Sequence, residues 1–300
     1  MPAIAVVMPV YNRADRVRRA IDSVLAQDFI DFELIVVDDG SRDGTADVVE
    51  AIPDPRIRCL RQPQNRGPSA ARNQGIREAA SPIICFIDSD DEFLPHKLGF
   101  IARYFMENSQ IDLLIDSFRE DLSSNLDMPP KEYTNPELEG SDEVERAAFG
   151  RRLRTPTPAL SARRDALLAA GLFDEKLKLR EDLDLVLRLT RSARCAATSK
   201  ILWTKHWLAD SLFRNNKDFV TGTIEICARH PDYLTRPEFR VHLARAVVRH
   251  FLRLAKKGRI GAAGTDLRRC ANFFGWPRMA GLFGAGLVEM LRRRVARRQG

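Results

Sequence analysis

The chain has 300 residues, of which 44% are hydrophobic and 30% are charged, and its formal net charge is +7. These values are typical of a globular protein with one large domain, or with a domain and an appendage. No run approaches the roughly 18 consecutive apolar residues of a membrane-spanning helix, and we expect a first strand rather than a signal peptide at the N-terminus. Charge is unevenly spread, because residues 240–300 hold 15 Lys and Arg against 2 acids. This basic region suggests a lipid, nucleic acid or other acidic partner, or only a solvated helical face.

The five cysteines are odd in number and scattered, and no two of them form a CxxC pair. This pattern predicts neither a disulfide framework nor a zinc site. We therefore expect reduced core cysteines in a cytoplasmic protein. The positions are Cys59, Cys85, Cys195, Cys227 and Cys270.

The first hundred residues alternate between strand-like apolar runs and helix-like segments. The predicted strands are 4–8, 33–37, 57–60 and 83–87, and the predicted helices are 14–26, 45–51 and 68–79. This order predicts an α/β fold with a parallel sheet covered by helices on both faces. The loops after Met8, Val37 and Ile87 would then meet at one edge of the sheet, where ligands of such folds bind.

The second part of the chain has a less regular pattern. Residues 121–140 are polar and rich in Pro, Asn and Glu, which predicts a surface loop. After this loop we expect helices at 142–149, 164–170 and 181–190 and a strand at 159–161, and beyond about residue 215 the pattern is helical only.

Carboxylates cluster directly after the predicted strand 83–87, in the run Asp88-Ser89-Asp90-Asp91. Crowded carboxylates repel one another, and oxygen ligands of this kind suit Mg²⁺ or Mn²⁺, which also bind a substrate diphosphate. The alternative is a cap for the helix that begins near Pro95, although a cap needs only one such side chain.

Three further segments combine with this cluster: Met8-Pro9-Val10-Tyr11-Asn12-Arg13, the run 33–41 that ends in Asp38-Asp39-Gly40-Ser41, and the run 65–73 that holds Arg66 and Arg72. In this order and at these intervals, the four segments resemble the inverting glycosyltransferases of family 2, of the bacterial type. The resemblance covers about residues 1–215. It implies a GT-A fold, with a mostly parallel sheet, a nucleotide-sugar half over 1–95, an acceptor half over 96–215 and a helical extension over 216–300.

The resemblance also implies roles for the residues of the first two segments. Asp39 would recognise the uracil of a UDP-sugar, with Asp38 supporting the turn and with Pro9, Tyr11 and Asn12 beside the donor. A carboxylate that accepts from a ring N–H gives base selectivity, because an unpaired buried polar group costs about 1–3 kcal/mol. The alternative is that the two acids only end a strand and cap a helix.

The resemblance also implies which residues of the last two segments bind the donor diphosphate and its metal. Arg66 and Arg72 would hold the diphosphate, although either could be a surface arginine at a helix start. Asp88, with Ser89 beside it, would reach the ribose or sugar and share the Mn²⁺ or Mg²⁺ with Asp90.

The run 180–189 begins with Arg180-Glu181-Asp182 and resembles the family segment with an acidic pair at a helix start. Asp182, next to Glu181, would be the general base that accepts the proton of the acceptor hydroxyl. The competing interpretation is that acids favour the first turn of any helix. His206 lies near a position where family members carry a His that completes the metal shell or touches the diphosphate. The pattern after it is shifted by one residue, and a lone His is more often structural.

We therefore expect a metal-dependent inverting glycosyltransferase that transfers a sugar from a nucleotide-sugar to a glycan, lipid-linked or protein acceptor. Two alternatives are a sugar nucleotidyltransferase, which would use a Gly-rich first loop that this chain lacks, and a basic nucleic-acid-binding protein, which leaves the acidic clusters unexplained. We expect no nucleic-acid partner and a cytoplasmic location. The apolar stretch 279–288 between basic flanks suggests peripheral contact with the inner face of the cell membrane, or packing on the catalytic domain.

Overall fold

The computed structural model describes residues 1–122, 129–206, 219–275, 277–278, 280–281 and 284–285. The chain divides into two compact units, one with residues 1–177 and 181–211 and the other with residues 178–180 and 212–300. The predicted boundary near residue 215 falls outside the described residues and stays a prediction, as does most of the apolar stretch 279–288.

In the described part of the first unit, ten strands form one sheet in the order β3-β2-β1-β4-β9-β6-β10-β5, with β7 beside β6 and β8 beside β10. The strands are β1 (Ile4–Val10), β2 (Phe32–Asp38), β3 (Ile57–Arg61), β4 (Ile83–Phe86), β5 (Glu92–Phe93), β6 (Leu113–Asp121), β7 (Lys131–Tyr133), β8 (Leu138–Glu139), β9 (Leu160–Arg163) and β10 (Cys195–His206). The four strands predicted first are all present, and they pair in parallel as β3-β2-β1-β4.

The expected mostly parallel sheet holds for these four strands, but the sheet as a whole is mixed. β9 lies antiparallel between β4 and β6, β5, β7 and β8 pair antiparallel at the far side, and β10 runs parallel to β6. β6 and β10 were not predicted from the sequence, and residues 121–140 were predicted to be a loop, where the described residues form β7 and β8. Two-residue and three-residue strands are too short for an alternation pattern to reveal them.

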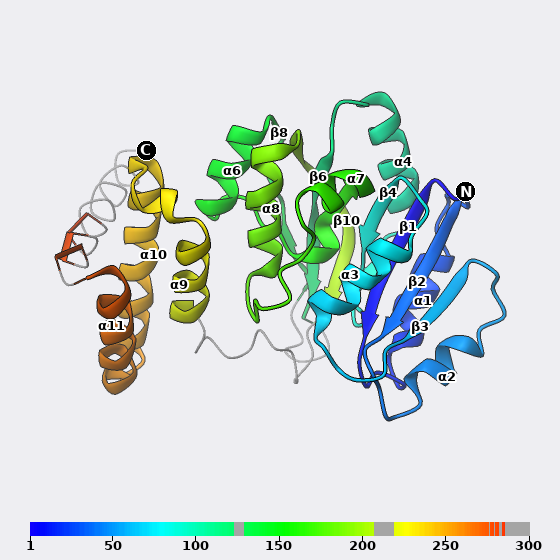
Figure 1. The fold of residues 1–300 in the computed structure, drawn as a ribbon, viewed down its shortest axis with the longest axis horizontal. Helices are drawn as coiled ribbons and strands as arrows, with labels where there is room; N and C mark the ends of the chain where they lie inside the picture. The colour runs from blue at the N-terminus through cyan, green and yellow to red at the C-terminus, as the bar shows by residue number, and fades with distance from the viewer. Residues whose placement is uncertain (123–128, 207–218, 276, 279, 282–283, 286–300) are drawn as a thin grey trace. The chain divides into compact units, whose positions relative to one another are not determined.

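Helices flank the sheet on both faces, as the α/β prediction requires (Figure 1). They are α1 (Val17–Leu25), α2 (Thr45–Glu50), α3 (Pro68–Glu78), α4 (Lys97–Glu107), α6 (Ser141–Phe149), α7 (Arg164–Ala169) and α8 (Glu181–Ser192), with the short 3-10 helix η1 (Thr157–Ala159). In α1 the buried residues Val17, Ala20, Ile21 and Val24 follow helical spacing, so one face meets the core. α3 approaches β1 closely at Gly75, where a Cβ atom would lie 2.5 Å from Cγ1 of Val7.

The second unit contains α9 (Phe219–Arg229), η4 (Pro231–Leu234), α10 (Pro237–Lys256) and α11 (Ile260–Phe274). These helices share an apolar core that includes Val220, Leu243, Val247 and Phe274. The helical C-terminal part expected from the sequence is therefore present. In the part of the chain that the structure describes, none of the helices combines the length and the apolar composition needed to cross a membrane.

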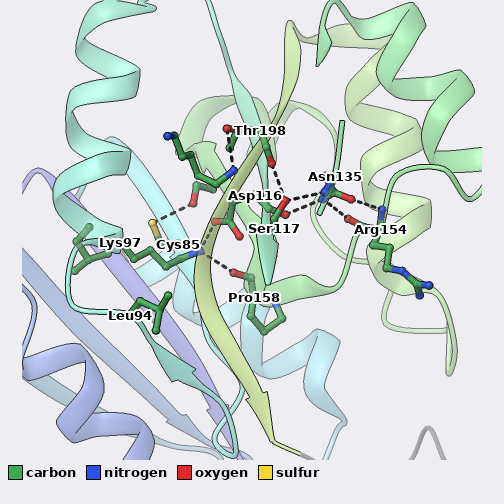
Figure 2. A network of polar contacts seen from close by, with 12 residues as sticks. Cys85, Leu94, Lys97, Asp116, Ser117, Asn135, Arg154, Pro158 and Thr198 are labelled. Carbon is green, nitrogen blue, oxygen red and sulfur yellow. Dashed lines mark hydrogen bonds and ion pairs between the residues drawn. The ribbon is translucent and has the colours of Figure 1, made fainter. Parts of the chain in front are cut away.

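A buried ion pair joins α4 to the sheet in the first unit. The ammonium of Lys97 donates to Asp116 on β6 and to the C=O of Pro158 at 3.1 Å, and the side chains of Lys97 and Asp116 are both 0% exposed. Figure 2 shows Lys97 extending from α4 to meet both partners. The pair therefore fixes the start of η1 against β6.

Asn135 extends the same network toward the segment before η1 (Figure 2). Its side-chain amide donates to the C=O of Asp116 at 2.7 Å and of Arg154 at 3.0 Å, and its Oδ1 accepts from the N–H of Arg154 at 2.8 Å. Asn135, which lies in the predicted surface loop, is thus only 2% exposed. Its side chain binds the backbone of β6 at Asp116 and the backbone before η1 at Arg154.

Candidate active site

The loops after β1 and β2 are joined by side-chain hydrogen bonds. The N–H of Asn12 donates to Oγ of Ser41 at 2.9 Å, and Oδ1 of Asn12 accepts from the N–H of Arg42 at 2.9 Å. Asn12 has a φ of 49°, a left-handed conformation that Asn tolerates better than most residues. Tyr11 beside it is 43% exposed, so its ring is open to a ligand.

Asp38, the last residue of β2, and Asp39 after it are both buried, and they make different contacts. Asp38 accepts from the N–H and the hydroxyl of Ser41, which closes the turn. Asp39 accepts from the N–H of Arg66 and of Gly67, both at 2.8 Å. Burial raises the pKa of Asp39 although these two N–H donors oppose the change. Asp39 therefore fixes the entry of α3, and each of its oxygens keeps a second lone pair.

The two predicted arginines, Arg66 just before α3 and Arg72 within it, have different surroundings. The side chain of Arg66 is 54% exposed and contacts Glu175 at 2.9 Å. Asn73, further along α3, donates to the C=O of Phe173 at 2.9 Å and accepts from the N–H of Phe173 at 2.9 Å. α3 is therefore tied to the 173–175 segment by residues about a hundred positions away in the sequence.

Arg72 is buried, with 6% of its side chain exposed, and its guanidinium bridges two carboxylates. Nη2 contacts Oδ1 of Asp88 at 2.7 Å, and Nη1 contacts Oε1 of Glu181 at 3.3 Å. Burial opposes the charge, but Asp88, Glu181 and Asp182 outweigh it and raise the pKa of the guanidinium. The cluster after β4 and the acidic pair of α8 therefore meet at one side chain.

The Asp88–Asp91 loop concentrates negative charge. Burial, followed by the charge of Asp88, raises the pKa of Asp90. Burial, followed by the charges of Asp88 and Asp90, raises the pKa of Asp91 well above its usual range. Arg13 and Lys205 lie near enough to counter the charge of Asp90 in part. A cation at this loop would relieve the remaining repulsion.

α8 begins with Glu181 and Asp182, and its first turn is anchored by an ion pair of the buried Asp184. Asp184 is 1% exposed and contacts Arg188 at 2.8 Å, and Arg188 also donates to the C=O of Ala170 and of Leu172. This anchor fixes the first turn of α8, so Glu181 and Asp182 keep a defined place. Glu181 is 20% exposed at its side chain, and Asp182 is partly exposed.

His206, at the end of β10, lies in an ion-pair cluster. Its Nε2 is 3.1 Å from Glu92 and its Nδ1 is 3.5 Å from Asp121, while its backbone N–H donates to Asp91 at 3.1 Å. Burial and the nearby Arg19 lower the pKa of the imidazole. The predicted metal role of His206 stays a prediction, because in this structure both ring nitrogens face carboxylates.

The chemistry of the loop carboxylates suits a divalent cation with few protein ligands. Among the described residues no three His, Cys, Asp or Glu side chains gather into a metal-binding group. Mg²⁺ in nucleotide enzymes is held by only one or two carboxylates together with substrate phosphates, so a complete protein cage is not required. Asp90 and Asp88 could supply these one or two carboxylates. Asp88 would do so while it also contacts Arg72.

Several residues of this region escaped the sequence analysis. Arg19 donates to the C=O of Asp90 at 2.9 Å and contacts Glu92 at 2.9 Å, and Lys205 lies near Asp90. In the sequence each of them is a single basic residue on a helix or strand, and this pattern cannot be distinguished from that of a solvent-exposed surface residue. Asp184 and Arg188 carried a usable signal, because acid and base four apart on a helix form ion pairs.

Comparison with known proteins locates the chain among curated relatives. It is 47% identical over 98 residues to a succinoglycan biosynthesis protein, ExoO, of Rhizobium meliloti, which covers 33% of this chain and 28% of that protein. It is 38% identical over 106 residues to the GalNAc(5)-diNAcBac-PP-undecaprenol beta-1,3-glucosyltransferase of Campylobacter jejuni, which covers 34% of each chain. Each match therefore spans about a third or less of the curated relative.

Solved structures share the fold over nearly the whole chain. Residues 1–349 of TarS from S. aureus, in complex with UDP-GlcNAc, match with a TM-score of 0.66 and 22% identity over 99% of this chain and 92% of that chain. A mannosyltransferase from Pyrobaculum calidifontis, in complex with GDP-Man and Mn²⁺, matches with a TM-score of 0.61 and 19% identity over 97% of this chain and 81% of that chain. At these identities the likeness establishes the GT-A type of fold.

The sequence model of one family spans the loops after β1, β2 and β4 but neither α8 nor β10. The family described as "Glycosyl transferase family 2" matches residues 5–168, more than half of the chain, and this range contains β1, β2, α3 and the Asp88–Asp91 loop. The chain belongs to glycosyltransferase family 2.

Proposed function

We propose that the protein transfers a glycosyl group from a nucleotide-sugar, of the UDP-sugar class, to an acceptor hydroxyl with inversion at the anomeric carbon. The observation that carries this proposal is the position of Arg72, which contacts Asp88 on the donor side and Glu181 on the acceptor side. One guanidinium thus keeps a donor-binding loop and a candidate base within one site.

On the donor side, Asp39 is the residue proposed for the base of the nucleotide. Its two oxygens are fixed by the N–H groups of Arg66 and Gly67, so the carboxylate is preorganised to accept from a uracil ring N–H. Support for a UDP-sugar comes from the bound UDP-GlcNAc of TarS. The GDP-Man of the Pyrobaculum enzyme shows that neighbours of this fold differ in their donor.

Asp90, with Asp88, is proposed to hold a divalent ion against the donor diphosphate. When bound, such an ion would neutralise the negative charge that develops on the leaving nucleoside diphosphate. The crowded carboxylates with raised pKa values support a cation at this loop, and Mn²⁺ in the Pyrobaculum complex supports its class.

Asp182 is proposed as the general base. The acceptor hydroxyl gives its proton to the Asp182 carboxylate while its oxygen bonds to the anomeric carbon. The bond from that carbon to the diphosphate oxygen breaks on the opposite face, and the electron pair leaves with the nucleoside diphosphate. Arg72 contacts Glu181 and thereby orients the first turn of α8 for this attack.

For the acceptor and location we propose a glycan or lipid-linked glycan, met at the cytoplasmic face of a membrane. Support comes from the Campylobacter relative, whose name specifies an undecaprenol-linked acceptor, and from the Rhizobium relative, whose name specifies succinoglycan biosynthesis.

Thermal melting with nucleotides, with and without Mn²⁺, tests the donor side. A ligand of the native state raises the melting temperature by mass action, so UDP should stabilise the protein more than GDP, and only with Mn²⁺ present. Asp39→Ala should abolish the preference for UDP. Equal stabilisation by both nucleotides would contradict the role of Asp39.

Asp182→Asn tests the chemical step separately. We expect it to retain the UDP-dependent melting shift and to lose transfer or donor hydrolysis by about 10²–10⁴-fold, the usual contribution of a general base. Asp165→Asn, at another acid in the first turn of a helix, is the matched control and should keep full turnover. Wild-type turnover in Asp182→Asn would remove the base assignment.

A further inference from the structure

α10 presents two chemically different faces in the second unit. One face is buried against the core of the unit through residues such as Phe239, Leu243 and Val247. The opposite side exposes Val241 and Leu252, which are 38% and 50% exposed and belong to the few large apolar side chains that the structure leaves open. A helix of 20 residues with exposed apolar groups opposite its packed face has the form of an interfacial helix.

Cations surround these exposed apolar groups. Positions 241, 249, 252 and 256 are spaced by eight, three and four residues, so they lie along one side of α10. We define the cationic face of α10 as Val241, Arg249, Leu252, Arg253 and Lys256, all of which are exposed.

One acid, Glu238, precedes the cationic face on α10, three residues before Val241, and after it the charged residues up to position 265 are all basic. Residues 239–265 include seven Lys and Arg and no Asp or Glu. The next acid, Asp266 on α11, contacts Nε2 of His250 at 2.8 Å, and this ring is 6% exposed at its side chain. Asp266 is thus engaged between α10 and α11, and from Arg249 to Lys256 the face presents positive charge only.

We propose that the cationic face of α10 binds the anionic phospholipids of a membrane, with Arg249, Arg253 and Lys256 on the headgroups and Leu252 in the acyl boundary. Charge complementarity accounts for the three basic residues, and each Lys or Arg near an anionic leaflet strengthens binding about fivefold. Nucleic acid would match the same charge, but its phosphate surface offers no apolar layer for Val241 and Leu252. An anionic lipid surface is the partner that matches both the basic and the apolar side chains of this face.

This inference deepens the proposed location of the enzyme, yet its test requires no catalysis. Sedimentation of the full chain with vesicles measures binding directly, using phosphatidylcholine alone and phosphatidylcholine with about a third of phosphatidylglycerol. We expect binding to the anionic vesicles only, and loss of that binding at high salt. Failure of transfer with intact vesicle binding would contradict the proposed function alone.

The variant R249Q/R253Q/K256Q should weaken vesicle binding by on the order of a hundredfold, the product of three cations. R77Q/R103Q/R152Q removes three exposed arginines of the first unit and the same net charge, and it should bind as the wild type does. Gln is a good helix former, so α10 should persist in the first variant, as circular dichroism will check.

Leu252→Trp reports the apolar component, because its fluorescence should shift to the blue on anionic vesicles and stay unchanged with duplex DNA. Equal weakening in both triple variants would overturn the proposal, since binding would then follow net charge alone. Tight binding to duplex DNA without binding to vesicles would also overturn it and would identify nucleic acid as the partner.

Discussion

Two buried cations of the first unit, Arg72 and Lys97, are each paired with carboxylates but differ in charge balance and solvent access. Lys97 faces one carboxylate, Asp116, and both side chains are sealed from solvent. Arg72 faces two, and one of them, Asp88, has a side chain that is 35% exposed. The first pair matches one cation with one carboxylate, whereas the second arrangement has more carboxylates than cations and opens toward the Asp88–Asp91 loop.

This difference separates a structural ion pair from a binding site. A pair sealed from solvent has no room for a ligand, so Lys97 and Asp116 can only fix α4, β6 and η1 relative to one another. An open arrangement with surplus carboxylates is electrostatically incomplete, and a cation or a substrate hydroxyl can complete it. Variants of the two regions should therefore affect different quantities.

Asp90→Asn should have the largest effect, on activity. Removing a carboxylate that holds the proposed metal should lower kcat/KM for transfer by three to four orders of magnitude, because a metal contributes several kcal/mol of charge stabilisation. The melting temperature should stay or rise, since Asn removes both the buried charge and its repulsion with Asp88, which together raise the pKa of Asp90. Steady-state kinetics and calorimetry check both parts, and a stability loss that parallels the activity loss would make Asp90 a structural residue.

Lys97→Met should have the opposite profile. It leaves Asp116 buried without its cation, which typically costs about 3–5 kcal/mol of unfolding free energy. Denaturant unfolding measures the loss, and activity per folded molecule should change little. Lys97→Met combined with Asp116→Leu removes both charges and should recover most of the stability. No recovery in the double variant would show that Lys97 contributes through packing instead.

Arg72→Met should lower both activity and stability, because Arg72 belongs to the site and is also buried. We expect a loss in kcat on the order of a hundredfold, similar to the loss of one preorganised donor in an active site. Arg72→Lys keeps the charge but not the two-armed geometry, and it should recover stability more than activity. Equal recovery of both would show that charge alone, without the bridge from Asp88 to Glu181, is sufficient.

The sequence predicts the donor side of this comparison better than the rest. The strands β1, β2 and β4 are largely apolar runs, and Asp38, Asp39 and Asp88–Asp91 lie at or directly after the ends of two of them, so order along the chain places these acids at one sheet edge. The contacts of Arg72 with Glu181 and of Lys97 with Asp116 depend instead on the position of later elements. β6 went unrecognised, so Asp116 could not be assigned as the partner of Lys97. For Arg72 the sequence left two interpretations open, a diphosphate contact and a surface arginine, and neither included the contact with Glu181.

The smallest effect concerns pH and the sealed pair. Burial raises the pKa of Asp116 to about 7, against the opposing charge of Lys97. Between about pH 4 and 7 the folded protein keeps a proton that the unfolded chain has released, so this group makes the protein more stable as pH falls, by at most about 1.4 kcal/mol per pH unit. Asp116→Asn lacks the titration but retains every other group. The difference in unfolding free energy between wild type and this variant should therefore shift in favour of the wild type from pH 7 to pH 5. A difference that is independent of pH would show that Asp116 stays charged beside Lys97 throughout.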